Sequence, residues 1–296
     1  MAEPGPPRWL DGAAGLGQTG QAEVAMEARE YELMYELELT HWWFVGKRLA
    51  AAALLRGVEP IAGLRVDVGA GTGALLSEHL GRGPAVGVEL DSLAAGLCAR
   101  RVGPVLVRGR SDALPLVAGA AGLVTVMDML YHQGVDVAAT LAECRRVLRP
   151  GGYLLVFDAA YQGLLGPHDR SMHAARRFTK SGLRVRVERA GLTVLRAGYR
   201  NALLAPGLIA LRLAAKWLDR LRGPRPDPPA SDVRRPPDAV NRLLLGLMAH
   251  EARWLRNHDL PLGTSVCLLA QKPQTGGMEI ETGGEHDRNS AGIGGL

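Results

Sequence analysis

Short apolar runs alternate with helical patterns through the middle of the chain. Runs of strand length lie at 64–67, 85–89, 105–108, 122–128 and 152–158. Between them, at 74–80, 91–101 and 135–148, apolar positions recur with the spacing of a helix that buries one face. This alternation predicts a parallel sheet whose strands are joined by right-handed crossover helices. The central part of the chain is therefore predicted to be α/β.

The last third of the chain predicts two more strands, at 192–199 and 263–273, separated by a long insertion. The insertion, 201–261, contains a helical pattern that Pro206 interrupts, a proline-rich linker and a second helical pattern at 239–255. If the last two strands form an antiparallel hairpin, the sheet is complete without the insertion. The insertion is then predicted to be a helical cap over the substrate side.

The two ends of the chain lack a periodic pattern. Residues 1–21 are rich in Gly, Pro and Ala, and 274–296 are rich in Gly and Glu. Both segments are predicted to be disordered tails, because such compositions cannot bury a core. The sequence therefore predicts one domain over 22–273, which opens with two helices at 22–57.

Composition narrows the class of protein. The chain has 296 residues, a net charge of +5 and three cysteines that lie far apart. It lacks an apolar stretch of the ~18 residues that span a bilayer, and it lacks the start of a secretory signal, so a soluble, cytoplasmic protein is expected. Cysteine spacing indicates neither a zinc site nor a disulfide framework. The basic excess is not interleaved with aromatic residues, which disfavours nucleic acid as a partner.

A glycine-rich loop follows the first apolar run. The sequence VDVGAGTG places Asp67 near the end of the strand and glycines at Gly69, Gly71 and Gly73, directly before a helix. Glycine allows positive φ angles there and lets a ligand approach the backbone closely. A strand, a tight turn and a helix N-terminus together can cradle a nucleotide-like group. The spacing G-x-G-x-G differs from the G-x-G-x-x-G that is typical of dinucleotide enzymes.

Polar residues at later strand ends extend this predicted site. Glu89 ends the second strand, where a carboxylate can accept hydrogen bonds from both hydroxyls of a ribose. Asp128 ends the fourth strand, and Tyr131 and His132 follow it. Because the carboxyl ends of parallel strands share one edge of the sheet, these residues are predicted to lie near the glycine loop.

The ordered series DVGAGTG, GVELD, SDALP, VMDMLYH and RVLRPGGYLLVFD resembles the motifs of class I S-adenosylmethionine-dependent methyltransferases over 64–158. The resemblance implies a Rossmann-like sheet of seven strands, mostly parallel with the last strand antiparallel, with helices on both faces. It also implies S-adenosyl-L-methionine as the cofactor, with Asp112 receiving the exocyclic amine of adenine. The residues that the resemblance assigns to cofactor binding are Asp67, Gly69, Ala70, Gly71, Gly73, Glu89, Leu90, Asp112, Ala113 and Asp128.

Three further segments narrow the resemblance. HWWF at 41–44, H-x-x-RRFT at 173–179 and LPLGTS at 260–265 resemble a bacterial subgroup of methyltransferase type 11-like enzymes with a helical insertion before the last strand. Tyr131 stands where related enzymes have the glutamate of a D-x-x-E-H motif, so no carboxylate role is expected there. Two interpretations of the HWWF rings stay open: they anchor the N-terminal helices on the core, or they form a lid that faces the sulfonium cation.

Methyl transfer to a hydroxyl group also requires a base. A histidine with a near-neutral pKa suits that role. His132 is the first candidate because it follows the fourth strand, and His173 and His168 come next. Arg176 and Arg177 are candidates for clamping a carboxylate or phosphate of the acceptor. No metal site is predicted, because H-D-x-x-x-H is not an established ligand spacing.

The predicted function is methyl transfer to a small-molecule, lipid or glycan acceptor, with O-methylation favoured over C- or N-methylation. The loop spacing disfavours a nicotinamide-dependent oxidoreductase, and the lack of a D/N-P-P-Y motif after the fourth strand disfavours methylation of a base amine. A non-catalytic or nucleic-acid-directed member of the same fold stays an alternative. Peripheral membrane contact through 201–261 is a rival use of the insertion.

Overall fold

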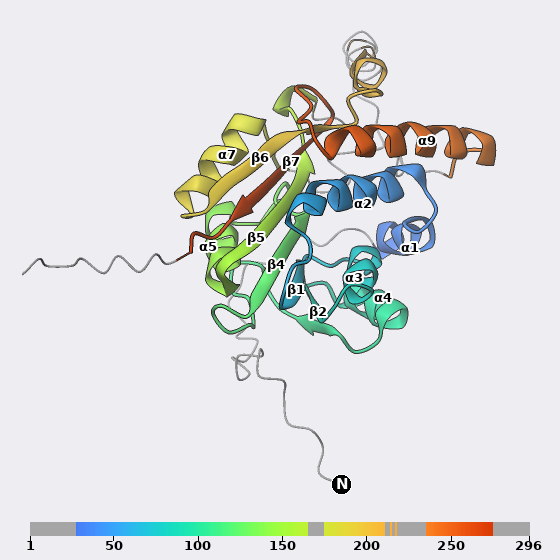
Figure 1. Ribbon diagram of the computed structural model, residues 1–296. Helices are drawn as coiled ribbons and strands as arrows, with labels where there is room; N and C mark the ends of the chain where they lie inside the picture. Colours follow the sequence, from blue (N-terminus) through green and yellow to red (C-terminus); the bar gives the residue numbers. More distant parts are fainter. Residues whose placement is uncertain (1–27, 165–174, 211–213, 215–216, 218–234, 275–296) are drawn as a thin grey trace, which may run out of the picture.

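A seven-stranded sheet forms the centre of the protein (Figure 1). This computed structural model describes residues 28–164, 175–210, 214, 217 and 235–274. The strand order is β3-β2-β1-β4-β5-β7-β6. Strands β1 to β5 pair in parallel, whereas β7 is antiparallel to both β5 and β6. The predicted fold, mostly parallel with an antiparallel last strand, is confirmed.

The observed elements follow the predicted alternation closely. The strands are β1 (Leu64–Val68), β2 (Ala85–Glu89), β3 (Leu106–Arg108), β4 (Ala121–Met127), β5 (Leu148–Ala159), β6 (Thr193–Arg200) and β7 (Ser265–Gln271). The helices are α1 (Ala28–Leu37), α2 (Trp42–Leu55), α3 (Ala74–Leu80), α4 (Ser92–Val102), α5 (Val137–Val147), α7 (Lys180–Arg189) and α9 (Asp238–Leu255), with short 3-10 turns η1 (Arg56–Val58) and η2 (Gln162–Leu164). The bounds of β2 and α3 coincide with those predicted.

Helices cover both faces of the sheet (Figure 1). On one face, α5 and α7 pack through buried side chains such as Leu141 and Leu183. On the other face, α2 and α9 contribute Leu54 and Leu255, which pack with Leu155 of β5 and other apolar side chains. Helices α3 and α4 pack beside β1 and β2. None of the described helices is both long enough and apolar enough to cross a membrane.

Helix α9 belongs to the packed core, which changes the interpretation of the insertion. A Cβ at Gly46 of α2 would lie 2.7 Å from the Cβ of Met248 in α9, so only glycine allows the two helices to approach this closely. Asn241 of α9 also accepts a hydrogen bond from the backbone N of Trp42 at 2.9 Å. All seven strands lie outside 201–261, but α9 packs on one face of the sheet, because an amphipathic pattern suits core packing as well as a cap.

Helix ends differ from the predictions in two places. A helical segment begins at Ala205, so Pro206 lies in its first turn instead of breaking a longer helix. Proline is tolerated there because the first N–H groups of a helix have no intrahelical partner. The pattern from Lys47 to Leu55 predicts a second helix, and α2 begins earlier, at Trp42, because the His41 side chain caps it. The predicted tail 1–21 and, apart from Gln274, the predicted tail 274–296 lie outside the described residues.

Candidate active site

The glycine loop connects β1 to α3 at the carboxyl edge of the sheet. Gly69, Gly71 and Gly73 have φ angles of 71°, 54° and 89°. At Gly73 a Cβ would lie 2.6 Å from Sγ of Cys98 on α4, so both the backbone angle and the packing require glycine. At Gly69 and Gly71 a Cβ would meet the side chains of Met129, at 2.8 Å, and Met34, at 3.3 Å, so glycine also makes room for these neighbours.

Glu89 is held against this loop. Its Oε2 accepts a hydrogen bond from the backbone N of Gly71 at 2.8 Å, and its Oε1 accepts from Leu90 and Asp91, each at 2.9 Å. Burial raises the pKa of Glu89, while the three backbone donors act in the opposite direction. A carboxylate oxygen has two acceptor positions, so both positions of Oε1 are used and Oε2 keeps one for a ligand. The structure thus brings together three residues predicted as cofactor ligands, Glu89, Gly71 and Leu90.

Asp67 lies under the loop in a buried chain of hydrogen bonds. Thr125 of β4 donates its hydroxyl to Asp67 at 2.7 Å, and His79 of α3 contacts the same hydroxyl oxygen at 3.1 Å. Burial raises the pKa of Asp67 to about 7 and lowers that of His79 to about 3. Because the hydroxyl proton points to Asp67, the His79 ring must donate its Nε2 proton to Thr125. Neither His79 nor Thr125 was predicted from the sequence as a site residue, because no motif includes them.

The loop after β3 carries Asp112 and Ala113. Arg110 binds the Asp112 carboxylate with two hydrogen bonds, both at 2.8 Å, which hold the pKa of Asp112 below its usual range. The hydroxyls of Ser111 and Thr140 are 3.0 Å apart and tie the loop to α5. Asp112 is thus positioned by its neighbours beside the end of β3.

Asp128 follows β4 and has a positive φ of 52°, which is unusual for a residue other than glycine. Its Oδ2 lies 2.6 Å from Nζ of Lys47 on α2. Lys47 was not predicted as a site residue, and it reaches the strand end only because α2 packs on the sheet. The HWWFVGKR segment therefore supplies a charged group to the same edge as the glycine loop.

The predicted catalytic histidines are only partly described. His132 is half-buried in the loop after β4, and its ring stacks on Tyr131 with centroids 4.2 Å apart. His168 and His173 lie outside the described residues. Arg176 and Arg177, predicted as an anion clamp, instead donate to the backbone carbonyls of Val135 at 2.8 Å and Ala160 at 3.0 Å. Through these contacts the two arginines support the loops at the ends of the strands.

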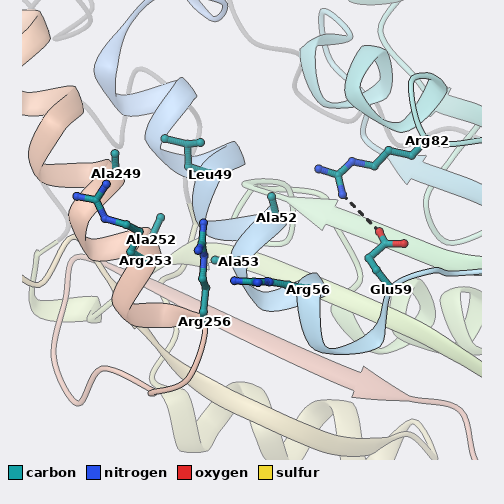
Figure 2. A pocket seen from close by; sticks show the side chains of 10 residues that line it. All are labelled: Leu49, Ala52, Ala53, Arg56, Glu59, Arg82, Ala249, Ala252, Arg253 and Arg256. Carbon is teal, nitrogen blue, oxygen red and sulfur yellow. Dashed lines mark ion pairs between the residues drawn. The ribbon is translucent and has the colours of Figure 1, made fainter.

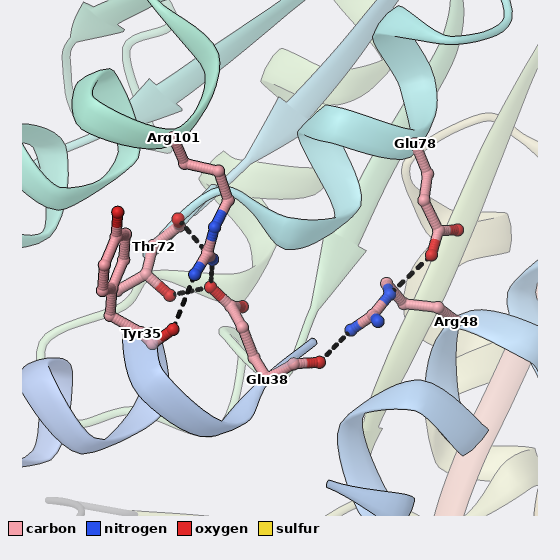
Figure 3. A network of polar contacts seen from close by, with 6 residues as sticks. All are labelled: Tyr35, Glu38, Arg48, Thr72, Glu78 and Arg101. Carbon is pink, nitrogen blue, oxygen red and sulfur yellow. Dashed lines mark hydrogen bonds and ion pairs between the residues drawn. The ribbon is translucent and has the colours of Figure 1, made fainter. Parts of the chain in front are cut away.

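A polar network ties the N-terminal helices to the glycine loop (Figure 3). The Glu38 side chain, just after α1, contacts the hydroxyl of Thr72 in the loop and the guanidinium of Arg101. Arg101 also donates to the carbonyls of Thr72 at 2.9 Å and Tyr35 at 2.6 Å. Arg48 of α2 bridges the Glu38 carbonyl, at 2.5 Å, and Glu78, at 2.6 Å. These contacts favour the anchoring interpretation of the N-terminal helices.

A separate pocket lies between α2 and α9 (Figure 2). Its volume is about 430 Å³, and Glu59 and Arg82, which line one side, precede β1 and β2. It is therefore remote from the carboxyl ends of the strands, where the glycine loop lies. The remaining lining residues are Leu49, Ala52, Ala53, Arg56, Ala249, Ala252, Arg253 and Arg256.

Comparisons with known proteins agree with this geometry. Residues 66–156 match the family described as a methyltransferase domain. A chain of the complex between the Haloferax volcanii Trm112 methyltransferase activator and a methyltransferase has a TM-score of 0.52 at 19% identity, over 83% of this chain and 94% of that one. No curated protein matches the chain significantly.

Two further solved structures are similar. A structure described as a sarcosine dimethylglycine methyltransferase from Galdieria sulphuraria has a TM-score of 0.50 at 16% identity, over 77% of this chain and 85% of that one. The [4+2]-cyclase SpnF has a TM-score of 0.51 at 17% identity, over 83% and 95% of the two chains. At these identities the likeness establishes the fold. The protein has the class I methyltransferase fold.

Proposed function

We propose that the protein is an S-adenosylmethionine-dependent methyltransferase that acts on a small-molecule, lipid or glycan acceptor. The observation that carries the proposal is the contact between Glu89 and Gly71, which holds a carboxylate against the backbone of the glycine loop. This contact lies inside the segment that matches a methyltransferase domain. The cofactor is S-adenosyl-L-methionine, which supplies a methyl group activated by its sulfonium cation.

The described residues suit this cofactor. The remaining acceptor position on Glu89 Oε2 can bind a ribose hydroxyl, and Asp112, fixed by Arg110, can accept the adenine amine. Ala70, Leu90 and Ala113 would lie beside the same cofactor. Asp128 places a negative charge at the end of β4, where its carboxylate forms an ion pair with Lys47. The protein's main contribution would be to hold acceptor and methyl group in line, which can supply ~7–11 kcal/mol of rate acceleration.

His132 is the proposed general base for a hydroxyl acceptor. It lies four positions after Asp128 on the loop that follows β4, and the stacking on Tyr131 limits the orientations of its ring. A half-buried imidazole can accept a proton near neutral pH, which suits O-methylation. His173 and His168 stay alternative candidates.

Several broader expectations also stay proposals. The protein is proposed to be cytoplasmic and to belong to the bacterial subgroup with the HWWF motif. Its domain is proposed to span 22–273, between two dispensable tails. Residues 201–261 are proposed to cover the acceptor with their part that precedes α9, or to contact a membrane surface. A non-catalytic or nucleic-acid-directed member of the same fold is the alternative function.

Calorimetric titration with S-adenosylmethionine tests the proposal directly. In Glu89→Gln the amide NH₂ meets backbone donors in either orientation, that of Gly71 or those of Leu90 and Asp91, so the dissociation constant should rise by roughly 5- to 150-fold, equivalent to ~1–3 kcal/mol. Glu188→Gln on α7 is a matched control, because the Glu188 carboxylate is exposed and forms an ion pair with Arg184 on the same helix. Wild-type affinity in Glu89→Gln would refute the ribose role.

Activity is tested with labelled cofactor and cell extract. Transfer of the labelled methyl group to an extract component, identified by mass spectrometry, is the expected result. Cofactor binding without any transfer would favour the non-catalytic alternative. Label in nucleic acid would favour the nucleic-acid-directed one, and binding of NADH in place of S-adenosylmethionine would refute the cofactor itself.

A further inference from the structure

Arg200, the last residue of β6, is a buried cation without a hydrogen-bond partner. Its exposed fraction is 1%, and Nε, Nη1 and Nη2 all lack a partner among the described residues. An arginine remains protonated in proteins and has five N–H donors. A fully buried guanidinium with no acceptor is costly, so its retention calls for a specific explanation.

The surroundings hold the guanidinium in place without satisfying it. Its Cζ lies 5.0 Å from the ring centroid of Trp43 on α2, in cation–π contact. Burial lowers the pKa of Arg200, and the charges of Asp128 and Glu251 act in the opposite direction. Both carboxylates are engaged elsewhere: Asp128 with Lys47 at 2.6 Å, and Glu251 with the backbone N of Asn201 at 2.5 Å.

Another arginine on the same strand shows what a structural role looks like. Arg196 lies four positions before Arg200 on β6, and its guanidinium binds Asp259 at 2.8 Å. It also donates to the carbonyls of Leu255 at 2.8 Å and His258 at 3.0 Å. The guanidinium of Arg196, whose role is structural, therefore has hydrogen-bond acceptors within the fold. The guanidinium of Arg200 has none among the described residues.

Unfavourable features gather at this part of the sheet edge. Asp128, Tyr161 and Asn201 follow β4, β5 and β6, and each has a positive φ, of 52°, 61° and 58°. Asn201 Oδ1 also lacks a hydrogen-bond partner within the described part of the chain. Strained backbone and unpaired polar atoms are typical of binding sites, where a ligand completes the contacts.

We propose that Arg200 binds an anionic group, a carboxylate or phosphate, of the methyl acceptor. The guanidinium fork matches two oxygens of such a group, and the Trp43 ring supports its other side. The place suits an acceptor, because β6 is separated by β4, β5 and β7 from the strand β1 that carries the glycine loop. This assignment rests on the proposed function and gives it a substrate class: acids or phosphate esters.

The test compares two variants of one strand, Arg200→Met and Arg196→Met. Removing a buried unpaired charge should leave the urea midpoint of the ligand-free protein equal or raise it, whereas Arg196→Met should lower it. A structural role for Arg200 predicts a lowered midpoint in both variants, and that result would overturn the assignment. Arg200→Lys keeps the charge without the fork, and should keep the stability.

Anion binding is measured with inorganic phosphate and, separately, acetate, each against chloride at the same ionic strength. We expect at least one of them to raise the melting temperature of wild type and Arg196→Met, with the rise lost in Arg200→Met and reduced in Arg200→Lys. The anion that acts tells phosphate from carboxylate. No response in wild type, or an undiminished one in Arg200→Met, overturns the proposal.

Calorimetry with S-adenosylmethionine separates this inference from the proposed function. Arg200→Met should bind the cofactor with wild-type affinity. A weaker affinity would assign the guanidinium to the cofactor's own carboxylate and overturn the acceptor assignment. Failure of wild type to bind S-adenosylmethionine would instead overturn the proposed function, whatever the anion response.

Discussion

The buried pair Asp67 and His79 should give the protein's stability two opposing dependences on pH. In the folded protein the pKa of Asp67 is raised from 3.8 to about 7, and that of His79 is lowered from 6.5 to about 3. Between these values, folded Asp67 holds a proton that the unfolded chain lacks. Folded His79 lacks a proton that the unfolded chain holds.

The signs follow from the number of protons bound in each state. Stability contributed by Asp67 is present below the unfolded pKa of 3.8 and is lost as the pH rises through about 7. Stability contributed by His79 is present above the unfolded pKa of 6.5 and is lost as the pH falls towards about 3. Between about pH 5 and pH 6 the two slopes, each about 1.4 kcal/mol per pH unit at most, should largely cancel.

Two isosteric variants separate these slopes. Asn at position 67 can still accept the hydroxyl proton of Thr125, and Gln at position 79 can still donate to the hydroxyl oxygen. His79→Gln leaves the Asp67 effect alone, so stability should fall as the pH rises. Asp67→Asn leaves the His79 effect alone, so stability should rise with pH over the same range.

Urea unfolding, followed by tryptophan fluorescence at several pH values from about 5 to about 6, measures these slopes as free energies. Groups outside the pair contribute equally to all three proteins, so the differences between the curves isolate the pair. The two variants should diverge by up to about 3 kcal/mol per pH unit, the sum of the two slopes. Parallel curves for wild type and both variants would refute the assigned protonation states.

Two remaining predictions concern the core and the chemistry. Leu255→Ala should lower the free energy of unfolding, measured in urea, by ~2–5 kcal/mol, because the Leu255 side chain is 0% exposed. Leu243→Ala, at 65% exposure on the same helix, should change it by less than about 0.5 kcal/mol. Equal effects of the two substitutions would contradict the core assignment of α9. His132→Gln should reduce labelled methyl transfer ~10²–10⁴-fold at unchanged S-adenosylmethionine affinity, and full transfer would exclude His132 as the base.

The parts of the site that lie close to regular elements could be predicted from the sequence. The apolar run of β2 ends at Glu89, and its pairing with β1 brings that carboxylate to the loop that begins at Gly69. Parallel topology alone therefore predicts the contact, because adjacent strand ends share an edge. Thr179 was likewise predictable as the cap of α7, since it uses only local backbone donors.

Contacts between distant segments could not be predicted. Lys47 and Asp128 are 81 positions apart, and Asp67 and Thr125 are 58 apart. Each pair depends on the docking of one element onto another, which an apolar pattern specifies only as a buried face. The same ambiguity affected α9, whose amphipathic pattern indicated burial without indicating whether sheet, acceptor or membrane covers it.

The two halves of the sheet edge differ in how fully their polar groups are satisfied. Around the glycine loop, Glu89 and Asp67 both have short hydrogen bonds within the protein, so that half is organised before a ligand binds. At the end of β6, Arg200 and Asn201 have side-chain atoms that find no hydrogen-bond partner among the residues that the structure describes. A preorganised half suits a cofactor common to a whole fold, and an unsatisfied half suits a ligand that must supply the missing acceptors. The difference therefore locates acceptor specificity at Arg200, where the family motifs give no information.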